Sequence, residues 1–209
     1  MLLDFNGLLT KYNLQIKGII HIGAHFGQEY NTYKQNNINN LIFFEPVPHT
    51  FKILQNNIGE NALLVNKALG NENKKISMNI EYINNGQSSS ILEPEIHLIQ
   101  HPNIIFTDKI EVDMVRLDDY LKEENINVNE YNFINMDVQG YELEVLKGSA
   151  EMLNNIDYIM TEVNRDEVYK NCARIEQLDS FLEPYGFIRV ETNWAGNTWG
   201  DAQYIKYKE

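Results

Sequence analysis

Three carboxylic acids each stand at the end of a short apolar run that is typical of a buried β-strand. Glu45 closes the run "NLIFFE", Asp137 closes "FINMD" and Glu162 closes "IDYIMTE". The carboxyl ends of parallel strands form the ligand crevice of an open α/β sheet, so we expect the three acids to lie along one rim. A carboxylate at such a rim can accept a proton from a substrate hydroxyl or hold the hydroxyls of a ligand.

A glycine-bearing segment, "IGAHFGQE", precedes the first of these acids. Gly23 and Gly27 have no side chain, so the backbone there can turn tightly and approach a ligand. Glu45 follows near the ~20-residue spacing at which an acid pairs with ribose hydroxyls. The combination predicts a cofactor that carries adenosine. Glycines that only pack a helix against a strand would also explain the loop.

The same loop favours S-adenosylmethionine over a dinucleotide. A dinucleotide site has the spacing G-x-G-x-x-G with its pyrophosphate on the helix N-terminus, whereas this loop has G-x-x-x-G and places Glu29 in the first helical turn. That acid would repel a pyrophosphate, while the sulfonium and amino groups of S-adenosylmethionine are cationic. An NAD-type oxidoreductase stays as an alternative, and no Walker-type G-x-x-x-x-G-K-[ST] supports nucleotide hydrolysis.

Apolar periodicity predicts the elements that position these residues. After an opening helix over Leu2 to Tyr12, strands in "GIIHIGA", "NLIFF" and "ALLVNKAL" alternate with helices. Further on, "FINM" is followed by the helix "GYELEVLKGSAEML", and "IDYIMTEVN" by a helix around Arg174 to Tyr185. The strands "FIRVETN" and "AQYIKY" then form a terminal hairpin. Such alternation is the signature of a parallel sheet with right-handed crossovers.

The alternation breaks after the third strand, where we expect a small β insertion. "KISMNIEYI" and "KIEVDMV" alternate apolar and polar residues as half-buried strands do, and "LDDYLKEENI" predicts a short helix. Residues 84–108 between the two strands are turn-rich, and loops of that length are uncommon unless they are functional or disordered. We interpret this segment as a lid or substrate loop, with a plain surface insertion as the alternative.

Composition limits the class of protein further. The 209 residues are enough for one α/β domain with a full core, and no Pro/Gly/Ser-rich linker divides them, so residues 1–209 are expected to form a single domain. A formal net charge of −13 disfavours nucleic acid as a partner, because such binding depends on Lys and Arg. The single cysteine, Cys172, and the lack of a leader or a ~20-residue apolar span predict a cytoplasmic protein without membrane insertion.

At the level of motifs, the chain resembles the FkbM family of S-adenosylmethionine-dependent methyltransferases. The motifs are "IIHIGAHFGQE", "FFEPVP", "NKALGN", "VRLDDYL", "INMDVQGYELEVLKGSAEML" and "TEVN", in the family's order and spacing. The resemblance implies an α/β, Rossmann-like class I methyltransferase fold, with a mostly parallel central sheet, helices on both faces and an antiparallel last strand. His21 departs from the pattern, because many relatives carry there an acid that contacts the cofactor's amino group. The candidate cofactor-binding residues are His21, Gly23, Ala24, Gly27, Glu29, Glu45, Pro46 and Asp137.

Methyl transfer to an alcohol needs a base that accepts the hydroxyl proton, or a metal ion that lowers its pKa. Asp137 is the first candidate for the base, and Glu142 and Glu162 are further catalytic candidates. Each also has a structural interpretation: a helix N-cap for Asp137, a partner of the helix dipole for Glu142, and a solvated strand end for Glu162. Oxygen ligands from Asp137, Glu162 and Asn164 could hold Mg²⁺, although a metal is not favoured.

Other polar residues are less suited to the chemistry. His25 lies in the glycine loop and could act as a base, but a hydrogen bond within its own loop is the preferred interpretation. We interpret His97 and His101 in the long loop as surface residues. Ser88–Ser90 resemble a serine-bearing loop of the family, and they lack the G-x-S-x-G form of a nucleophile elbow, so hydrolase chemistry is not expected.

The resemblance implies an O-methyltransferase, and we expect it to act on a hydroxyl of a sugar in a glycan or glycan precursor. Trp194 and Trp199, in the predicted loop "WAGNTWGD", could stack on a sugar ring, and packing across the hairpin would explain them equally. Within the enzyme class, the alternative is a small-metabolite O-methyltransferase with a polyketide-like substrate. Outside it, the alternative is a non-catalytic adenosyl-binding domain. The sequence indicates neither the acceptor nor the oligomeric state.

Overall fold

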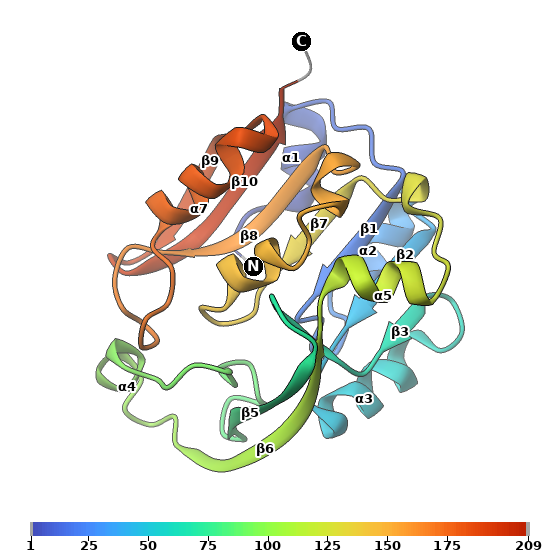
Figure 1. The fold of residues 1–209 in the computed structure, drawn as a ribbon. Coiled ribbons are helices and arrows are strands. Elements are labelled where there is room, and N and C mark those ends of the chain that lie inside the picture. The colour runs from blue at the N-terminus through green and yellow to red at the C-terminus, as the bar shows by residue number, and fades with distance from the viewer. Residues whose placement is uncertain (1, 208–209) are drawn as a thin grey trace.

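The structure of the protein, a computed structural model, describes residues 2–207 and is built around one sheet of seven strands. They lie in the order β3-β2-β1-β7-β8-β10-β9 (Figure 1). Neighbours from β3 to β8 pair in parallel, whereas β10 is antiparallel to β8 and β9, so the predicted sheet is confirmed. The strands are β1 (Gly18–Ile22), β2 (Asn40–Phe44), β3 (Leu63–Val65), β7 (Phe133–Met136), β8 (Tyr158–Asn164), β9 (Phe187–Ala195) and β10 (Trp199–Lys206).

Helices cover both faces of this sheet, as expected for a Rossmann-like fold. The α-helices concerned are α1 (Phe5–Lys11), α2 (Tyr30–Gln35), α3 (Pro48–Ile58), α5 (Leu117–Glu123), α6 (Glu142–Lys147) and α7 (Ile175–Leu182). Ile19 of β1 packs in a core with side chains of α1, α2 and α3, while Ile20 packs in a second core with α5, α6 and α7. Successive strand residues point to opposite faces. All five residues of β1 are therefore buried, which explains its continuous apolar run.

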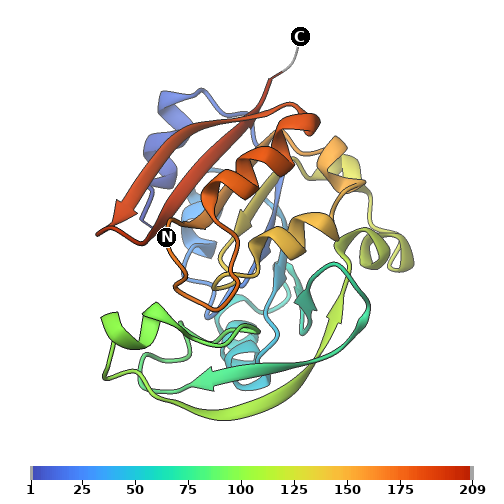
Figure 2. The same cartoon turned by 60° about the vertical axis from the view of Figure 1, so that its left-hand side comes forward.

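A second, three-stranded sheet follows the third strand, as predicted. Its order is β4-β6-β5, with β5 and β6 antiparallel. Figures 1 and 2 show this sheet beyond the carboxyl ends of the central parallel strands, on the side where a ligand crevice is expected. The strands are β4 (Ala68–Leu69), β5 (Lys74–Glu81) and β6 (Phe106–Val115).

The predicted third strand, "ALLVNKAL", is wrong as a single element. It divides into β3, which pairs with β2 in the central sheet, and β4, which pairs with β6 in the second sheet. Asn66 lies at the division, and its Nδ2 donates to the carbonyl oxygens of Glu45 (2.8 Å) and Pro46 (3.0 Å). These side-chain hydrogen bonds take the place of strand-to-strand bonds at this point, where the chain leaves the first sheet and enters the second.

The helix predicted over "GYELEVLKGSAEML" is also shorter than expected. Helix α6 ends at Lys147, and its C-cap Gly148 packs so closely on Gly70 that a Cβ there would lie 1.9 Å from the carbonyl oxygen of Gly70. The chain continues as a 3₁₀ helix. At its start, the backbone N–H groups of Glu151 and Met152 donate to the carboxylate of Asp118. The 3₁₀ helices are η1 (Val128–Glu130), η2 (Met152–Asn154) and η3 (Glu183–Tyr185).

The segment 84–108, called the lid below, contains the short helix α4 (Ile96–Gln100) and runs into the start of β6. It crosses the carboxyl-terminal side of the sheet (Figure 2). The C-terminal hairpin is tighter than predicted, since Trp194 lies in β9 and Trp199 in β10, with only residues 196–198 between the strands. Over residues 2–207, none of the helices combines the length and the apolar character that crossing a bilayer requires.

Candidate active site

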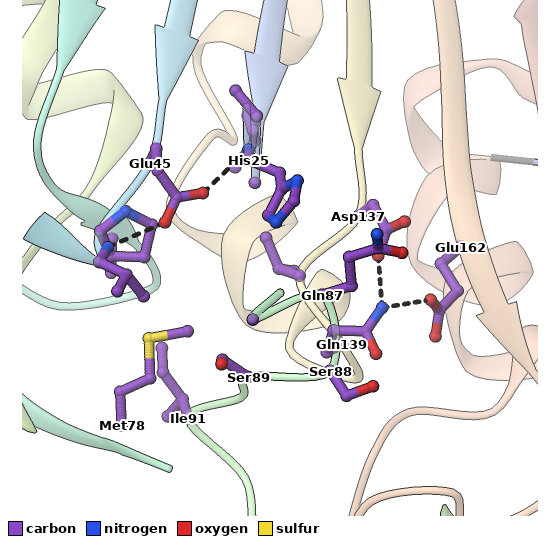
Figure 3. Close-up of a pocket in the computed structure, with 18 of the residues that line it drawn as sticks. His25, Glu45, Met78, Gln87, Ser88, Ser89, Ile91, Asp137, Gln139 and Glu162 are labelled. Carbon is purple, nitrogen blue, oxygen red and sulfur yellow. Dashed lines mark hydrogen bonds between the residues drawn. The ribbon is translucent and has the colours of Figure 1, made fainter. Parts of the chain in front are cut away.

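A cavity of about 350 Å³ lies at the carboxyl ends of β1, β2, β7 and β8. The three acids predicted to share a rim, Glu45, Asp137 and Glu162, all line it (Figure 3). The lid closes the opposite side, and Ser88 and Ser89 contribute to that wall. The expectation that the ends of separate strands converge on one site is therefore confirmed for these acids.

The glycine loop approaches the sheet closely at Gly23 and packs on a helix at Gly27. At Gly23, where φ is +77°, a Cβ would lie 1.9 Å from the carbonyl oxygen of Asp137, so only glycine fits between β1 and β7. At Gly27 a Cβ would meet Leu54 and Ile58 of α3 at 2.8 and 2.9 Å. Gly27 does not line the cavity, unlike Gly23 and Ala24. The structure thus gives Gly27 the packing role that was considered beside ligand binding.

Glu45 is a buried carboxylate that is held by the backbone. Its Oε1 accepts from the N–H of Val47 and its Oε2 from the N–H of His25, each at 2.9 Å. Burial raises the pKa of Glu45 to about 7, against the opposing effect of these two hydrogen bonds. The carboxylate is fixed against the start of the glycine loop, where a ribose of an adenosyl cofactor would lie.

Asp137 and Glu162 form a pair bridged by one amide. Nε2 of Gln139 donates to Oδ1 of Asp137 at 2.7 Å and to Oε2 of Glu162 at 2.8 Å (Figure 3). Burial raises the pKa of Glu162 well above its usual range, and the nearby charge of Asp137 raises it further. A charge on one of two neighbouring carboxyl groups disfavours a charge on the other, so burial and Asp137 together favour the protonated form of Glu162.

Gln139 is a site residue that sequence reasoning missed. It has a left-handed backbone, with φ at +54°, which is uncommon for a residue other than glycine. Its Oε1 lies 2.7 Å from the hydroxyl of Tyr169, and its carbonyl oxygen accepts from Oγ of Ser90 at 2.7 Å. Its position between the acids in "DVQGYE" was the available signal, but its partners lie far away in the sequence.

Glu142 supports the turn that carries Gln139 and does not line the cavity. Its Oε1 accepts from the N–H groups of Val138 and Gly140, each at 3.1 Å. Burial raises the pKa of Glu142 to about 7. Helix α6 has Tyr141 as its N-cap, so the structure does not give Asp137 the capping role that was considered as an alternative.

The remaining predicted cofactor residues, His21, Glu29 and Pro46, line the cavity. His21 is buried, and burial lowers its pKa, so the imidazole is neutral at pH 7. Its Nδ1 lies 3.2 Å from the hydroxyl of Tyr33. Glu29 occupies the N-cap position of α2. The acids at this end of the cavity suit a cationic ligand better than a phosphate.

Of the three residues considered as possible metal ligands, only two line the cavity. Asn164 lies outside the cavity lining, although Asp137 and Glu162 are part of it. Among residues 2–207, no group of three or more His, Cys, Asp or Glu side chains is arranged to hold a metal ion. The structure therefore offers no ready site for Mg²⁺ from these candidates.

The histidines differ from one another. His25 bonds Gln28 through Nδ1 and the carbonyl oxygen of Asn85 through Nε2, each at 2.8 Å, so it ties its own loop to the lid. The interpretation of His97 as a surface residue is wrong: it is 4% exposed and lines the cavity. Packing of α4 against the 167–170 segment buries it, a contact that the sequence could not reveal. His101 is exposed and also lines the cavity.

The two tryptophans differ in whether they line the cavity, and so do the three serines. Trp199 lines the cavity, whereas Trp194 does not and stacks with Arg165, whose guanidinium carbon lies 3.7 Å from the ring centroid. Packing thus accounts for Trp194. Ser88 and Ser89 line the cavity, and Ser90 supports Gln139 from the lid side.

The cavity fits S-adenosylmethionine. Its volume falls in the ~300–1,000 Å³ range of small-molecule sites. Four acids line it, Glu29, Glu45, Asp137 and Glu162, against Lys67 as the one Lys or Arg among the described lining residues. This balance suits the cationic sulfonium. A fixed acid after β2 beside a glycine loop, at the edge of a Rossmann-like sheet, defines the class as S-adenosylmethionine-dependent methyltransferases.

Sequence comparison gives the family. Residues 21–189 match the Methyltransferase FkbM domain, and the protein belongs to that family. It is 29% identical over 181 residues to the 2-O-methyltransferase NoeI of Sinorhizobium fredii (strain NBRC 101917 / NGR234). The aligned part covers 81% of this chain and 72% of NoeI. The protein is thus an S-adenosylmethionine-dependent methyltransferase, as expected, in place of the alternatives of an NAD-type oxidoreductase and a non-catalytic domain.

Solved structures confirm the fold. The magnesium protoporphyrin IX methyltransferase ChlM of Synechocystis PCC 6803, with bound SAM, matches with a TM-score of 0.52 and 9% identity, over 97% of this chain and 76% of that chain. Sp1610 of Streptococcus pneumoniae, a tRNA (m1A22) methyltransferase by its description, matches in complex with S-adenosyl-L-methionine with a TM-score of 0.53 and 12% identity, over 100% of this chain and 76% of that chain. At such identities the likeness concerns the fold alone.

Proposed function

We propose that the protein methylates a hydroxyl group of a sugar, in a glycan or glycan precursor, and that it does so in the cytoplasm. The observation that carries the proposal is the pair of Asp137 and Glu162 in the wall of the cavity, bridged by Nε2 of Gln139. The relative NoeI is named a 2-O-methyltransferase, which supports an oxygen acceptor. A buried free cysteine, Cys172, is compatible with a reducing compartment.

The acid pair supplies a base, Asp137, beside a second buried carboxyl group, Glu162. When bound, S-adenosylmethionine supplies an electrophilic methyl group. Asp137 accepts the proton of the acceptor hydroxyl, and burial together with the charge of Asp137 raises the pKa of Glu162. Gln139 holds both carboxyl groups in place, so no reorganisation of the pair is needed as the proton moves. General-base catalysis of this kind contributes ~10²–10⁴-fold to the rate.

The charge of the cavity favours a neutral acceptor. With Lys67 as the one Lys or Arg among the described lining residues, a carboxylate or phosphate near the acid pair would be repelled. A sugar hydroxyl meets this condition, and so does a hydroxyl of a neutral polyketide-like metabolite. The small-metabolite enzyme therefore stays as the second candidate function.

The test is transfer of radioactive methyl from S-adenosylmethionine to a panel of methyl glycosides and neutral phenols. We expect transfer to at least one glycoside, and we expect Asp137→Asn to lower turnover at least 100-fold while leaving the Kd for S-adenosylhomocysteine within about twofold. Asparagine keeps an oxygen that can accept from Gln139, so the variant is close to isosteric. The exposed Asp113 on β6 provides the matched control, Asp113→Asn.

Each contrary outcome has a distinct meaning. Full turnover in Asp137→Asn would remove Asp137 as the base without touching the choice of acceptor. Transfer to phenols but to no glycoside would replace the sugar by the small-metabolite acceptor.

A further inference from the structure

Three separate segments outside the glycine loop contribute to the cavity wall. The lid contributes His97, His101 and Ile104, the loop after β8 contributes Val168, and β10 contributes Trp199. None of these residues is a candidate for the base or for cofactor binding. This part of the wall is therefore free to meet the acceptor.

His97 is held rigidly in this wall. Its backbone N–H donates to the carbonyl oxygen of Val168 at 3.1 Å. Its ring lies against those of Tyr169 and Phe106, with centroids 5.4 and 5.5 Å apart. The segment before it is also fixed, since the N–H of Lys170 donates to the carbonyl oxygen of Glu93 at 2.8 Å. The imidazole is therefore preorganised in the lid.

Neither ring nitrogen of His97 has a hydrogen-bond partner among residues 2–207. Nδ1 is buried and covered, whereas Nε2 is not among the buried unpaired atoms. Burial lowers the pKa of His97 to about 4, so at pH 7 the neutral ring has one nitrogen that donates and one that accepts. Because His97 lines the cavity and polar groups of folded proteins are nearly always paired, an imidazole without a partner there points to a ligand group.

A chain of contacts connects His97 to the acid pair. Its ring packs on Tyr169, whose hydroxyl reaches Gln139, and Gln139 bridges Asp137 and Glu162. The ring of Tyr169 separates His97 from the acids, so one acceptor hydroxyl cannot meet both. A ligand that serves both must carry at least two hydroxyl groups on one compact frame, as a sugar ring does.

We propose that His97 binds a second hydroxyl of the acceptor sugar, one that is not methylated, and so selects which hydroxyl reaches Asp137. Trp199 in the same wall offers an apolar face for the ring. The inference rests on the proposed function, since it presumes a polyhydroxylated acceptor. It adds a specificity-determining residue in the lid, distinct from the base.

The experiment combines removal of single hydroxyl groups from the acceptor with removal of the imidazole of His97. Wild type and His97→Phe are assayed with one methyl glycoside that accepts methyl and with its set of mono-deoxy analogues. Phenylalanine keeps a ring against Tyr169 but has no polar atom. We expect one deoxy position, different from the methylated one, to lower kcat/KM about 10–100-fold in wild type. In His97→Phe, kcat/KM for the parent glycoside should fall by a similar factor. For that deoxy analogue, kcat/KM should be the same in His97→Phe as in wild type.

Controls separate this role from a structural one. Ile99→Ala changes an exposed neighbour on α4, where Ile99 is 79% exposed, and should leave the deoxy pattern unchanged. The Kd for S-adenosylhomocysteine should be unchanged in both variants. If His97→Phe lowers the melting temperature by more than a few degrees, His97→Gln is used in its place.

Two failures are distinguishable. If wild type methylates no glycoside, the proposed function fails and the assignment of His97 to a sugar fails with it. If wild type methylates a glycoside but its deoxy pattern is the same in the His97 variants, the proposed function stands and the role of His97 is overturned.

Discussion

At the residue scale, Glu142 is close to the pair of Asp137 and Glu162, yet its contacts are those of a support. Its Oε1 alone accepts both backbone hydrogen bonds, from Val138 and Gly140. Glutamine keeps that oxygen, so we predict that Glu142→Gln retains turnover within about twofold, because an amide can still make both bonds. Methyl-transfer assays at pH 7.5 check this. A loss of 100-fold or more would instead make Glu142 an acid or base of the reaction.

Glu45 should respond differently to the same chemical change. Both of its oxygens are used, one by the N–H of Val47 and the other by that of His25. A glutamine NH₂ cannot accept, so Glu45→Gln leaves one buried N–H without a partner and removes an acceptor for ribose hydroxyls. We predict that binding of S-adenosylhomocysteine weakens about 10–100-fold, the effect of ~1.5–3 kcal/mol. Calorimetric titration measures it.

The control for this titration is Glu60→Gln, which changes an exposed glutamate beyond α3. Its Kd should equal that of wild type. Unchanged binding in Glu45→Gln would mean that the cofactor does not depend on this carboxylate, and the ribose contact would have to be reassigned.

At the scale of elements, the lid is fastened to the sheet by contacts from several segments. The hydroxyl of Tyr169 lies 3.0 Å from the carbonyl oxygen of Ser88 and 2.7 Å from Oε1 of Gln139. We predict that Tyr169→Phe raises amide hydrogen exchange in residues 86–90 about 5–100-fold, because loss of a buried partner costs ~1–3 kcal/mol of local opening free energy. Exchange in β1 should not change. Mass spectrometry of wild type and variant makes the comparison.

Tyr207→Phe is the matched control, since Tyr207 is 73% exposed. Equal exchange of residues 86–90 in wild type and Tyr169→Phe would show that other contacts hold the lid, and His25, which bonds the carbonyl oxygen of Asn85, would be the next to change.

The sequence could predict those elements that are formed by interactions between residues close together in the chain. Buried parallel strands and amphipathic helices are encoded in local periodicity, and they were predicted nearly throughout. The division of "ALLVNKAL" was not, because it depends on Asn66 bonding the backbone of Glu45 and Pro46, some twenty residues earlier. Nor was the early end of α6, where Gly148 packs on Gly70.

The candidate site divides in the same way. Glu45, Asp137 and Glu162 could be placed together because the rule for parallel strand ends is topological. Gln139 and His97 could not, because each is held by Tyr169, which lies in a loop distant in the sequence. A histidine in a turn-rich segment has no local signal that distinguishes a buried ligand-binding ring from a solvated one.

At the scale of the whole molecule, net charge disfavours nucleic acid as a partner. The fold is shared with Sp1610, which is described as acting on tRNA, but this chain has 30 Asp and Glu against 17 Lys and Arg. We predict no binding to tRNA in a fluorescence anisotropy titration at about 0.05 M salt, where neutralisation of phosphates would be strongest. Saturable binding that weakens as salt is raised would contradict this and would call for a basic surface.

Buried acids should also make the stability of the whole molecule depend on pH. Burial raises the pKa of Glu45 and of Glu142 to about 7, and that of Glu162 well above its usual range. Each therefore binds its proton more tightly in the folded than in the unfolded chain. The free energy of unfolding falls as pH rises through the folded pKa, because the folded state must then hold a desolvated charge.

The buried histidines act in the opposite direction, but in another range. Burial lowers the pKa of His21 and that of His97, so their contribution rises with pH only up to the unfolded value of about 6.5. Above pH 6.5 only the acids remain, and we predict that the free energy of unfolding declines between pH 6.5 and 8 by about 1 kcal/mol for each acid that titrates there. Urea unfolding at constant ionic strength measures the decline.

Glu142→Gln identifies the cause. Its amide keeps both backbone hydrogen bonds but does not titrate, so this variant should show a decline smaller by about 1 kcal/mol and should exceed wild type in stability at pH 8. Glu60→Gln, at an exposed position, should follow the wild-type curve. Stability that stays level or rises from pH 6.5 to 8 in the wild type would mean that these carboxyl groups are solvated in solution, and the raised pKa of Glu162 beside Asp137 would then lose its physical basis.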